Sequence, residues 1–266
     1  MPAALRPLHL AAEIGGPPPR GVRHDAAGYA ELARLAERGH LDFITLGDTP
    51  GRPGPDALAV LSGVVPATRR IGLVPAVDAG CFRVPEAVAV LDRATGGRAG
   101  WLAGGPSAEH ATDDPGGPAA ARDRSQGRPV TVIDATREQD REAAARYADV
   151  ALIGVGGPEE AAAIRELLCE RAAAHGRAPG TLRVLAALTV GLSGGERSGS
   201  AGGAGGGGQV EAPEIPGAVA PLYRGGPVDL AELITTWHRT GAVDGFHLTP
   251  AEPPRDLERL VNGTVA

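Results

Sequence analysis

Polar side chains follow several of the predicted strands in this chain, at the point where each strand ends. Asp48 follows the second strand, Thr136 and Arg137 follow the fifth, and His247 lies on the eighth. In a barrel of parallel strands, the residues that carry chemistry lie at these carboxyl ends. Polar residues at these ends, these four among them, are therefore candidates for contact with a bound molecule, although their spacing matches no well-known catalytic motif.

Several reaction classes are excluded by what the sequence lacks. It contains no HExxH motif, no GxxxxGK[ST] motif and no cluster of Cys and His, so we predict neither a metal site nor a nucleotide-binding P-loop. All 26 basic residues are arginine, which excludes Schiff-base chemistry on a lysine. The formal net charge of −6 gives no electrostatic footprint for nucleic acid.

The same composition indicates a cytoplasmic protein. No apolar run approaches the roughly 18 residues that a membrane span needs. The first residues hold prolines and Glu13, so they do not form the apolar core of a signal peptide. Two cysteines, Cys81 and Cys169, cannot build a disulfide framework, and we interpret them as thiols in a reducing compartment.

Short, uninterrupted apolar runs recur at intervals close to the roughly 30 residues of one strand–helix unit. Uninterrupted runs are typical of parallel strands that are covered on both faces. The predicted strands are 8–14, 43–46, 71–74, 100–103, 130–133, 150–155, 182–190 and 245–248. Helical patterns lie at 26–38, 56–67, 86–94, 138–148, 159–174, 229–239 and 254–261, and Gly39 is the predicted C-cap of the first.

Eight such units predict a single (β/α)8 barrel over residues 1–266, with an open, doubly wound sheet as the competing architecture. Two segments break the rhythm, so the barrel is expected to be trimmed after strands 4 and 7. Residues 105–128 lack an apolar stripe where the fourth helix belongs. Residues 193–216 have the glycine-rich composition of a flexible linker, and both segments are expected to be poorly ordered.

Ordered stretches of the chain resemble the luciferase-like flavin-dependent monooxygenases, in particular the branch that contains nitrilotriacetate, alkane and dibenzothiophene-sulfone monooxygenases. The first of them, YAELARLAERGHLDFITLGDT (29–49), resembles a helix and strand near the start of that barrel. The segment LDRATGGRAGW (91–101) resembles the approach to the fourth strand. Further resembling segments lie at 69–73, 128–153, 172–189 and 240–250.

This resemblance implies a (β/α)8 fold and an enzyme that oxygenates a small organic substrate with O2. The cofactor would be reduced FMN supplied by a separate flavin reductase, or deazaflavin F420 as in a related branch. Asp48 matches the family's aspartate beside the flavin, and Thr136 and Arg137 stand where the family binds the FMN phosphate. His247 occupies a position from which it can approach the flavin or its phosphate.

Two of these residues also have a structural interpretation that the sequence leaves open. Asp48 can cap a helix or form a salt bridge, and Thr136 can be a plain N-cap. Asp134 and Glu138 flank the loop that the resemblance assigns to the phosphate and would repel an anion, while the strand-four motif ends in Leu102 and Ala103 instead of polar residues. A degenerate barrel that acts as a non-catalytic partner subunit is therefore the alternative function, and a homo-oligomer is expected from exposed sheet surface.

Overall fold

The computed structural model describes residues 6–15, 26–47, 56–77, 84–103, 129–195, 208–211 and 220–265. Eight parallel strands stand side by side in the order β3-β2-β1-β10-β7-β6-β5-β4. The ring closes between β3 and β4, where the Leu73 amide donates to the Arg98 carbonyl at 3.0 Å and the Val77 amide to the Leu102 carbonyl at 3.0 Å. The predicted (β/α)8 barrel is confirmed, and the open sheet is not the architecture of this chain.

All eight predicted strands are present, with boundaries that differ by at most two residues. They are β1 (His9–Glu13), β2 (Phe43–Leu46), β3 (Gly72–Pro75), β4 (Gly100–Ala103), β5 (Val130–Asp134), β6 (Val150–Ile153), β7 (Arg183–Leu192) and β10 (Gly245–Pro250). Their agreement with the apolar runs follows from burial on both faces, which leaves little room for polar residues within a strand.

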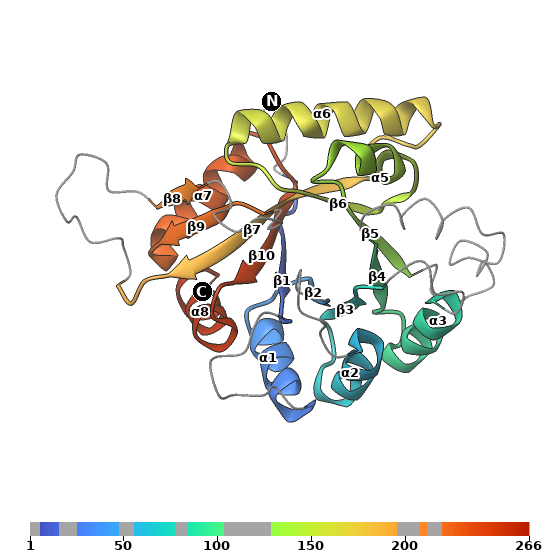
Figure 1. Cartoon of the computed structure of the whole chain (residues 1–266), viewed down its shortest axis with the longest axis vertical. Helices are drawn as coiled ribbons and strands as arrows, with labels where there is room; N and C mark the ends of the chain where they lie inside the picture. Colours follow the sequence, from blue (N-terminus) through green and yellow to red (C-terminus); the bar gives the residue numbers. More distant parts are fainter. Residues whose placement is uncertain are drawn as a thin grey trace.

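The helices form the outer layer around this ring (Figure 1). They are α1 (Ala26–Arg38), α2 (Ala57–Val64), α3 (Val84–Thr95), α5 (Arg141–Tyr147), α6 (Pro158–Ala174), α7 (Pro227–Arg239) and α8 (Pro253–Arg259). Short turns η1 (Val65–Ala67), η3 (Glu138–Asp140) and η4 (Leu260–Thr264) extend three of them. Within the described ranges, no helix is long and apolar enough to cross a membrane.

Helix α1 shows how the sequence pattern positions a helix. Five residues of one stripe, spaced one, three or four positions apart, are buried against the barrel, whereas the charged side chains of Glu31, Arg34 and Arg38 are exposed; the five are Tyr29, Leu32, Ala33, Leu35 and Ala36. Gly39 directly follows α1, at the position predicted for its C-cap, and the left-handed residue of this turn is His40, with φ of 55°. A Cβ on Gly39 would lie 2.7 Å from Cγ2 of Val261, so a side chain there would require Val261 to move.

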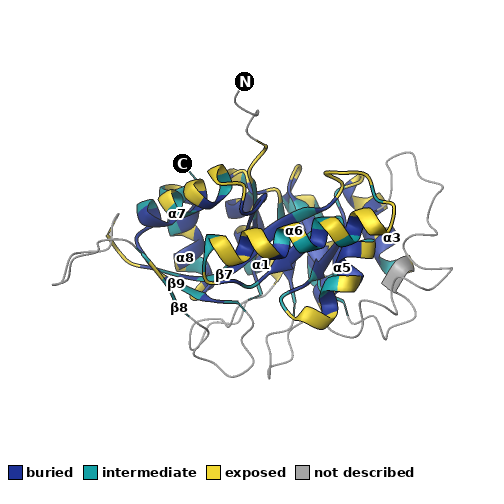
Figure 2. Ribbon diagram, turned by 90° about the horizontal axis from the view of Figure 1, so that it is seen from above, coloured by how far each residue is buried: buried dark blue, intermediate teal, exposed yellow. Residues whose placement is uncertain are grey.

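Apolar side chains form two separate cores. The larger core lies between the strands and the helices, where Trp101 and Phe246 are fully buried. The smaller core lies inside the ring and is built from Val74, Val132 and Leu185 together with neighbouring apolar residues. Figure 2 shows the result, with buried strands in the middle and exposed residues on the outer faces of the helices.

The two segments predicted to be irregular are described only in small part. Residues 104–128 lie outside the described residues, and so do 196–207 and 212–219. Within 193–216, however, residues Gln209–Glu211 form strand β8, which the composition did not predict. Strand β8 pairs with β9 (Leu222–Gly225), and β9 pairs with Thr189–Leu192 at the far end of β7. The last residues of the ten-residue β7 thus gain a hydrogen-bonding partner beyond the ring.

Candidate functional site

A chain of three polar side chains crosses the inside of the barrel near the carboxyl ends of β1, β2 and β10. The hydroxyl of Thr45 donates to Oε2 of Glu13 at 2.6 Å, and Nε2 of His247 lies 2.7 Å from the same hydroxyl. Thr45 and His247 are buried, and Glu13 is half-buried. Because a hydroxyl has one proton, a Thr45 that donates to an ionised Glu13 accepts from His247, which then carries its imidazole proton on Nε2.

Strand register explains why these side chains meet. Ala11 of β1 lies beside Phe43 of β2 on one side and beside His247 of β10 on the other. The small side chain of Ala11 leaves room above it, and the rings of Phe43 and His247 stack with centroids 6.4 Å apart. Two residues further along, Glu13 is the register partner of Thr45. All of these side chains point inward because strand residues alternate between the two faces.

Burial controls the protonation of His247 and Glu13. It lowers the pKa of His247 to about 4, so the imidazole is neutral at pH 7. Burial also raises the pKa of the Glu13 carboxyl above its ordinary value, although hydrogen bonds from Thr45, Gly15 and Gly47 oppose this effect. The pKa of the Tyr29 hydroxyl is raised as well, by burial and by the charge of Glu13.

Protonation of Glu13 would reverse the direction of both hydrogen bonds that join Glu13, Thr45 and His247. The carboxylic acid would then donate to Thr45, and the Thr45 hydroxyl would donate to Nε2 of His247 in its other tautomer. One proton can therefore be held at the Glu13 end, with the hydroxyl as the link between acid and imidazole. This is an arrangement that general acid–base chemistry uses, because both groups lie within hydrogen-bond reach of a common neighbour.

The second group of predicted residues lies across the same mouth, because β5 is four strands away from β1 in the ring. The Thr136 amide donates to Oδ1 of Asp134 at 3.0 Å, and the Thr136 hydroxyl accepts from the Gly154 amide at 3.0 Å. Among the described residues no acceptor takes the hydroxyl proton of Thr136, which is left to donate. The interpretation of Thr136 as a helix N-cap is wrong, since Arg137 occupies that position and makes no side-chain cap.

Arg137 is exposed at the start of the turn η3, and within the described ranges its guanidinium makes no ion pair or hydrogen bond. Glu138 follows it and is also exposed, so the loop has one cation and two carboxylates, Asp134 and Glu138. Asp134 is partly satisfied by the Thr136 amide. The loop thus offers a hydroxyl and a guanidinium, two groups that bind phosphate, next to two carboxylates that oppose it.

Asp48 lies outside the described residues and stays a prediction. Its neighbour Gly47 is described, and the Gly47 amide donates to Oε1 of Glu13 at 3.3 Å. The structure thus brings His247 together with Glu13 and Thr45, and it places Thr136 and Arg137 on the opposite side of the mouth. Nothing in the structure brings Thr136 or Arg137 into contact with His247.

Glu13 and Thr45 were missed as site residues by the reasoning from sequence. In the sequence, Glu13 stands out only as a charge near the first residues, and Thr45 lies within an apolar run. The signal that identifies them is alternation, because Glu13 and Thr45 occupy inward positions two residues after Ala11 and Phe43. A charged residue at an inward position of a buried strand is costly unless it is hydrogen-bonded, which points to a function.

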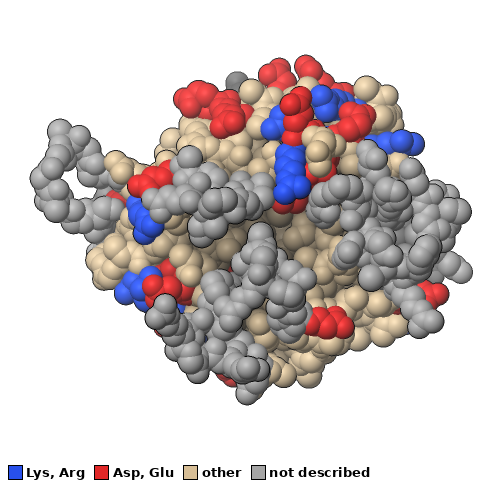
Figure 3. Space-filling model, viewed as in Figure 1, with Lys and Arg blue, Asp and Glu red and all other residues tan. Residues whose placement is uncertain are grey.

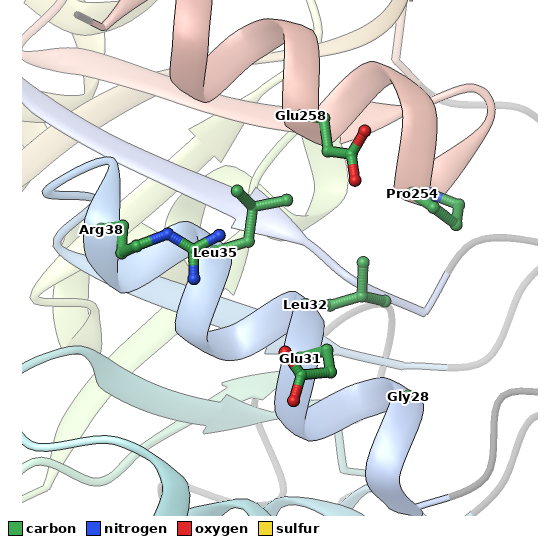
Figure 4. Close-up of a pocket in the computed structure, with 7 residues that line it drawn as sticks. All are labelled: Gly28, Glu31, Leu32, Leu35, Arg38, Pro254 and Glu258. Atoms are coloured by element: carbon green, nitrogen blue, oxygen red, sulfur yellow. The ribbon is translucent and has the colours of Figure 1, made fainter.

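A separate groove lies on the outside of the barrel between α1 and α8 (Figure 4), with a volume of about 250 Å³. Leu32 and Leu35 of α1 form its floor, and Glu31, Arg38 and Glu258 surround it. The groove contains none of the candidate residues.

On the face shown in Figure 3, acidic and basic side chains of the described residues are interspersed, and no large area carries charge of one sign. The described ranges also hold no group of three His, Cys, Asp or Glu side chains that could bind a metal ion.

Solved structures with the same fold are similar over almost the whole chain. EDTA monooxygenase from Chelativorans sp. BNC1 is 16% identical with a TM-score of 0.73, and the match covers 98% of this chain and 93% of that one. A long-chain alkane monooxygenase is 17% identical with a TM-score of 0.72 and coverage of 98% and 90%. A coenzyme F420-dependent tetrahydromethanopterin reductase from Methanopyrus kandleri is 13% identical with a TM-score of 0.66 and coverage of 98% and 99%.

One family model matches the first part of the chain. No curated protein matches the chain. The family model described as luciferase-like monooxygenase matches residues 7–125, a region that includes Glu13 and Thr45 of the buried polar chain. The chain is therefore similar in sequence to the luciferase-like monooxygenases over this region, and its closed barrel has the fold of solved monooxygenase structures.

Proposed function

We propose that this protein is a monooxygenase of the two-component type, which uses reduced FMN from a separate flavin reductase to oxygenate a small organic substrate with O2. The observation that carries the proposal is the buried chain of Glu13, Thr45 and His247 inside the carboxyl-end mouth of a luciferase-like barrel. Active sites of such barrels lie at this mouth. The proposal is also supported by the similarity of the fold to that of two monooxygenases.

The described residues fit a flavin phosphate at the end of β5. The Thr136 hydroxyl has a proton to donate, and the exposed Arg137 guanidinium can bind phosphate oxygens in bidentate fashion. Asp48 is proposed to contact the flavin ring system from the end of β2, and His247 to approach it from β10. Bound reduced FMN would supply the electrons that activate O2.

The protein's own groups have two tasks in this scheme. The apolar residues inside the ring, among them Val132, Leu152 and Leu185, keep water away from the floor of the site. Glu13 and His247 hold a proton beside that floor, linked through the Thr45 hydroxyl. Monooxygenation places one oxygen atom in the substrate and reduces the other to water, so it consumes protons that such a group can deliver.

Two other functions share this fold. A deazaflavin F420-dependent oxidoreductase would use the same barrel, and the same acid–base chain would serve hydride transfer to or from a carbonyl group. A non-catalytic subunit would keep the barrel and lose flavin binding. Titrations with FMN and with F420 separate the three functions. A monooxygenase should bind FMN more tightly, an F420-dependent oxidoreductase should bind F420 more tightly, and a non-catalytic subunit should bind neither.

The phosphate contact is tested by comparing FMN with riboflavin, which lacks the phosphate. Flavin fluorescence quenching of the wild-type protein should show FMN binding at least tenfold tighter than riboflavin, the effect of about one or two charge-assisted hydrogen bonds. The double variant Thr136→Ala, Arg137→Ala should bind FMN and riboflavin alike. The matched variant Glu138→Gln removes a repelling charge from the same turn and should tighten FMN binding. Unchanged FMN affinity in the double variant would refute this assignment.

A further inference from the structure

The opposite mouth of the barrel, where the strands begin, contains a hollow of about 460 Å³. Its walls carry the apolar side chains of Phe43, Val74, Val130 and Leu185, which come from four different strands. The inside of a barrel of this type is normally filled by layers of bulky side chains. Here the layer closest to this mouth is incomplete.

Glycine at two inward positions accounts for the missing volume. Gly72 of β3 and Gly100 of β4 both line the hollow. A Cβ on Gly72 would lie 2.8 Å from Cβ of Phe43, and a Cβ on Gly100 would lie 2.7 Å from the carbonyl oxygen of Val130. No side chain fits at either position without a shift of the neighbouring strand. The backbone packing of β3 and β4 therefore keeps this part of the barrel empty of side chains.

The rim of the hollow carries more positive than negative charge. Arg70, Arg98 and Arg183 line it, whereas Asp42 is its only carboxylate among the described residues. Asp42 already accepts a hydrogen bond from the Leu10 amide at 2.8 Å and lies 3.5 Å from Nδ1 of His9. Arg98 directs its guanidinium to backbone carbonyls, including that of Ile71 at 2.6 Å.

Arg183 stands out in this group. It begins β7 at an inward position and is half-buried, and within the described ranges its guanidinium has no ion pair or hydrogen bond. A partly desolvated cation is costly unless an anion or an acceptor compensates it. An apolar hollow next to such a cation has the composition of a small-molecule site, in which a few polar groups orient a mainly apolar ligand.

We propose that this mouth is a second binding site, which takes a small apolar carboxylate with its hydrocarbon part in the hollow and its carboxylate on Arg183. The volume lies within the roughly 300–1,000 Å³ that is typical of ligand pockets. The positive rim selects an anion over a neutral or cationic molecule of the same shape. Because it lies at the opposite ends of the strands from Glu13, the site is separate from the proposed flavin site.

The test uses 3-phenylpropanoate as the probe and its neutral amide as the matched ligand, with binding measured by isothermal titration calorimetry on the full-length protein. Saturable binding of the carboxylate at millimolar or lower concentration is expected, with the amide at least tenfold weaker. Absence of saturable binding at millimolar carboxylate, or equal binding of carboxylate and amide, would overturn the proposal.

Three variants locate the binding. Arg183→Gln should weaken the carboxylate about tenfold, whereas Arg69→Gln removes an exposed arginine that does not line the hollow and should leave binding unchanged. Val130→Phe adds bulk at a residue that lines the hollow and is 42% exposed, so it should abolish binding while the fold is retained, as circular dichroism would show. Carboxylate binding that survives both Arg183→Gln and Val130→Phe would place the ligand elsewhere and refute the proposal.

Discussion

Replacing His247 by glutamine tests the buried polar chain through its effect on stability at different pH values. The substitution keeps an amide nitrogen that can donate to the Thr45 hydroxyl but removes the titrating ring. His247 is 6% exposed, and burial lowers its pKa to about 4. In the unfolded chain a histidine titrates near its ordinary value of about 6.5.

The sign of the effect follows from proton binding. Below about pH 6.5 His247 is protonated in the unfolded chain, whereas in the native protein it stays neutral down to about pH 4. The stability that depends on a neutral His247 is therefore complete above pH 6.5 and is lost as the pH falls toward 4. A difference of about 2.5 pKa units corresponds to about 3 kcal/mol by pH 4, and to about 2 kcal/mol by pH 5.

The assay is urea unfolding of the wild type and His247→Gln at several pH values between 7 and 4. The free energy of unfolding of the wild type should fall relative to that of the variant by about 2 kcal/mol between pH 7 and pH 5. The raised pKa of Glu13 acts in the opposite direction, but it is present in both proteins and cancels in the difference. His40→Asn, an exposed position with a left-handed backbone, is the control and should behave as the wild type. A difference that stays constant across this pH range would refute the buried, neutral state of His247.

Three further predictions concern the scaffold. Asp244→Ala should lower the free energy of unfolding by about 3–5 kcal/mol, because the buried carboxylate accepts from the Val184 amide and from Arg165, and urea unfolding that shows less than about 1 kcal/mol would contradict this. Leu61→Ala should cost about 2–5 kcal/mol in the same assay, because Leu61 is fully buried, whereas a near-neutral effect would mean that α2 is not packed on the barrel. Burial acts to raise the pKa of Glu37, but hydrogen bonds from three backbone amides outweigh this effect and hold the pKa below its ordinary value. The wild type should therefore have a higher free energy of unfolding than Glu37→Gln above pH 4.5, and this difference should disappear as the medium becomes more acidic. A difference that grows in acid would contradict this.

Much of the fold can be predicted from the sequence because the strands are buried on both faces. The apolar runs and their spacing are sufficient to predict all eight barrel strands, and Ala26–Arg38 is predicted to the residue from its apolar stripe. Strand β8 could not be predicted, since Gln209–Glu211 is too short for a pattern and adjoins a glycine tract. Its existence depends on pairing with β9, which is a contact between distant residues.

The candidate site could be predicted only in part. His247 is recognisable as a polar residue at the end of a strand, but its partners depend on the register of β1 with β2 and β10. The apolar run that contains Thr45 gives no sign that its hydroxyl links Glu13 to an imidazole. For Thr136, the hydrogen bond from the Gly154 amide could not be predicted, because it joins the ends of two neighbouring strands.

The measurement that tests the proposed function most directly is an anaerobic titration of the purified protein with reduced FMN, with oxidised FMN and F420 titrated in parallel. We predict saturable binding of reduced FMN with a dissociation constant in the micromolar range, which corresponds to a binding free energy of about −8 kcal/mol. F420 should bind more weakly. Tighter binding of F420 would instead assign the barrel to deazaflavin chemistry, and absence of binding by every flavin would contradict a flavin-dependent enzyme.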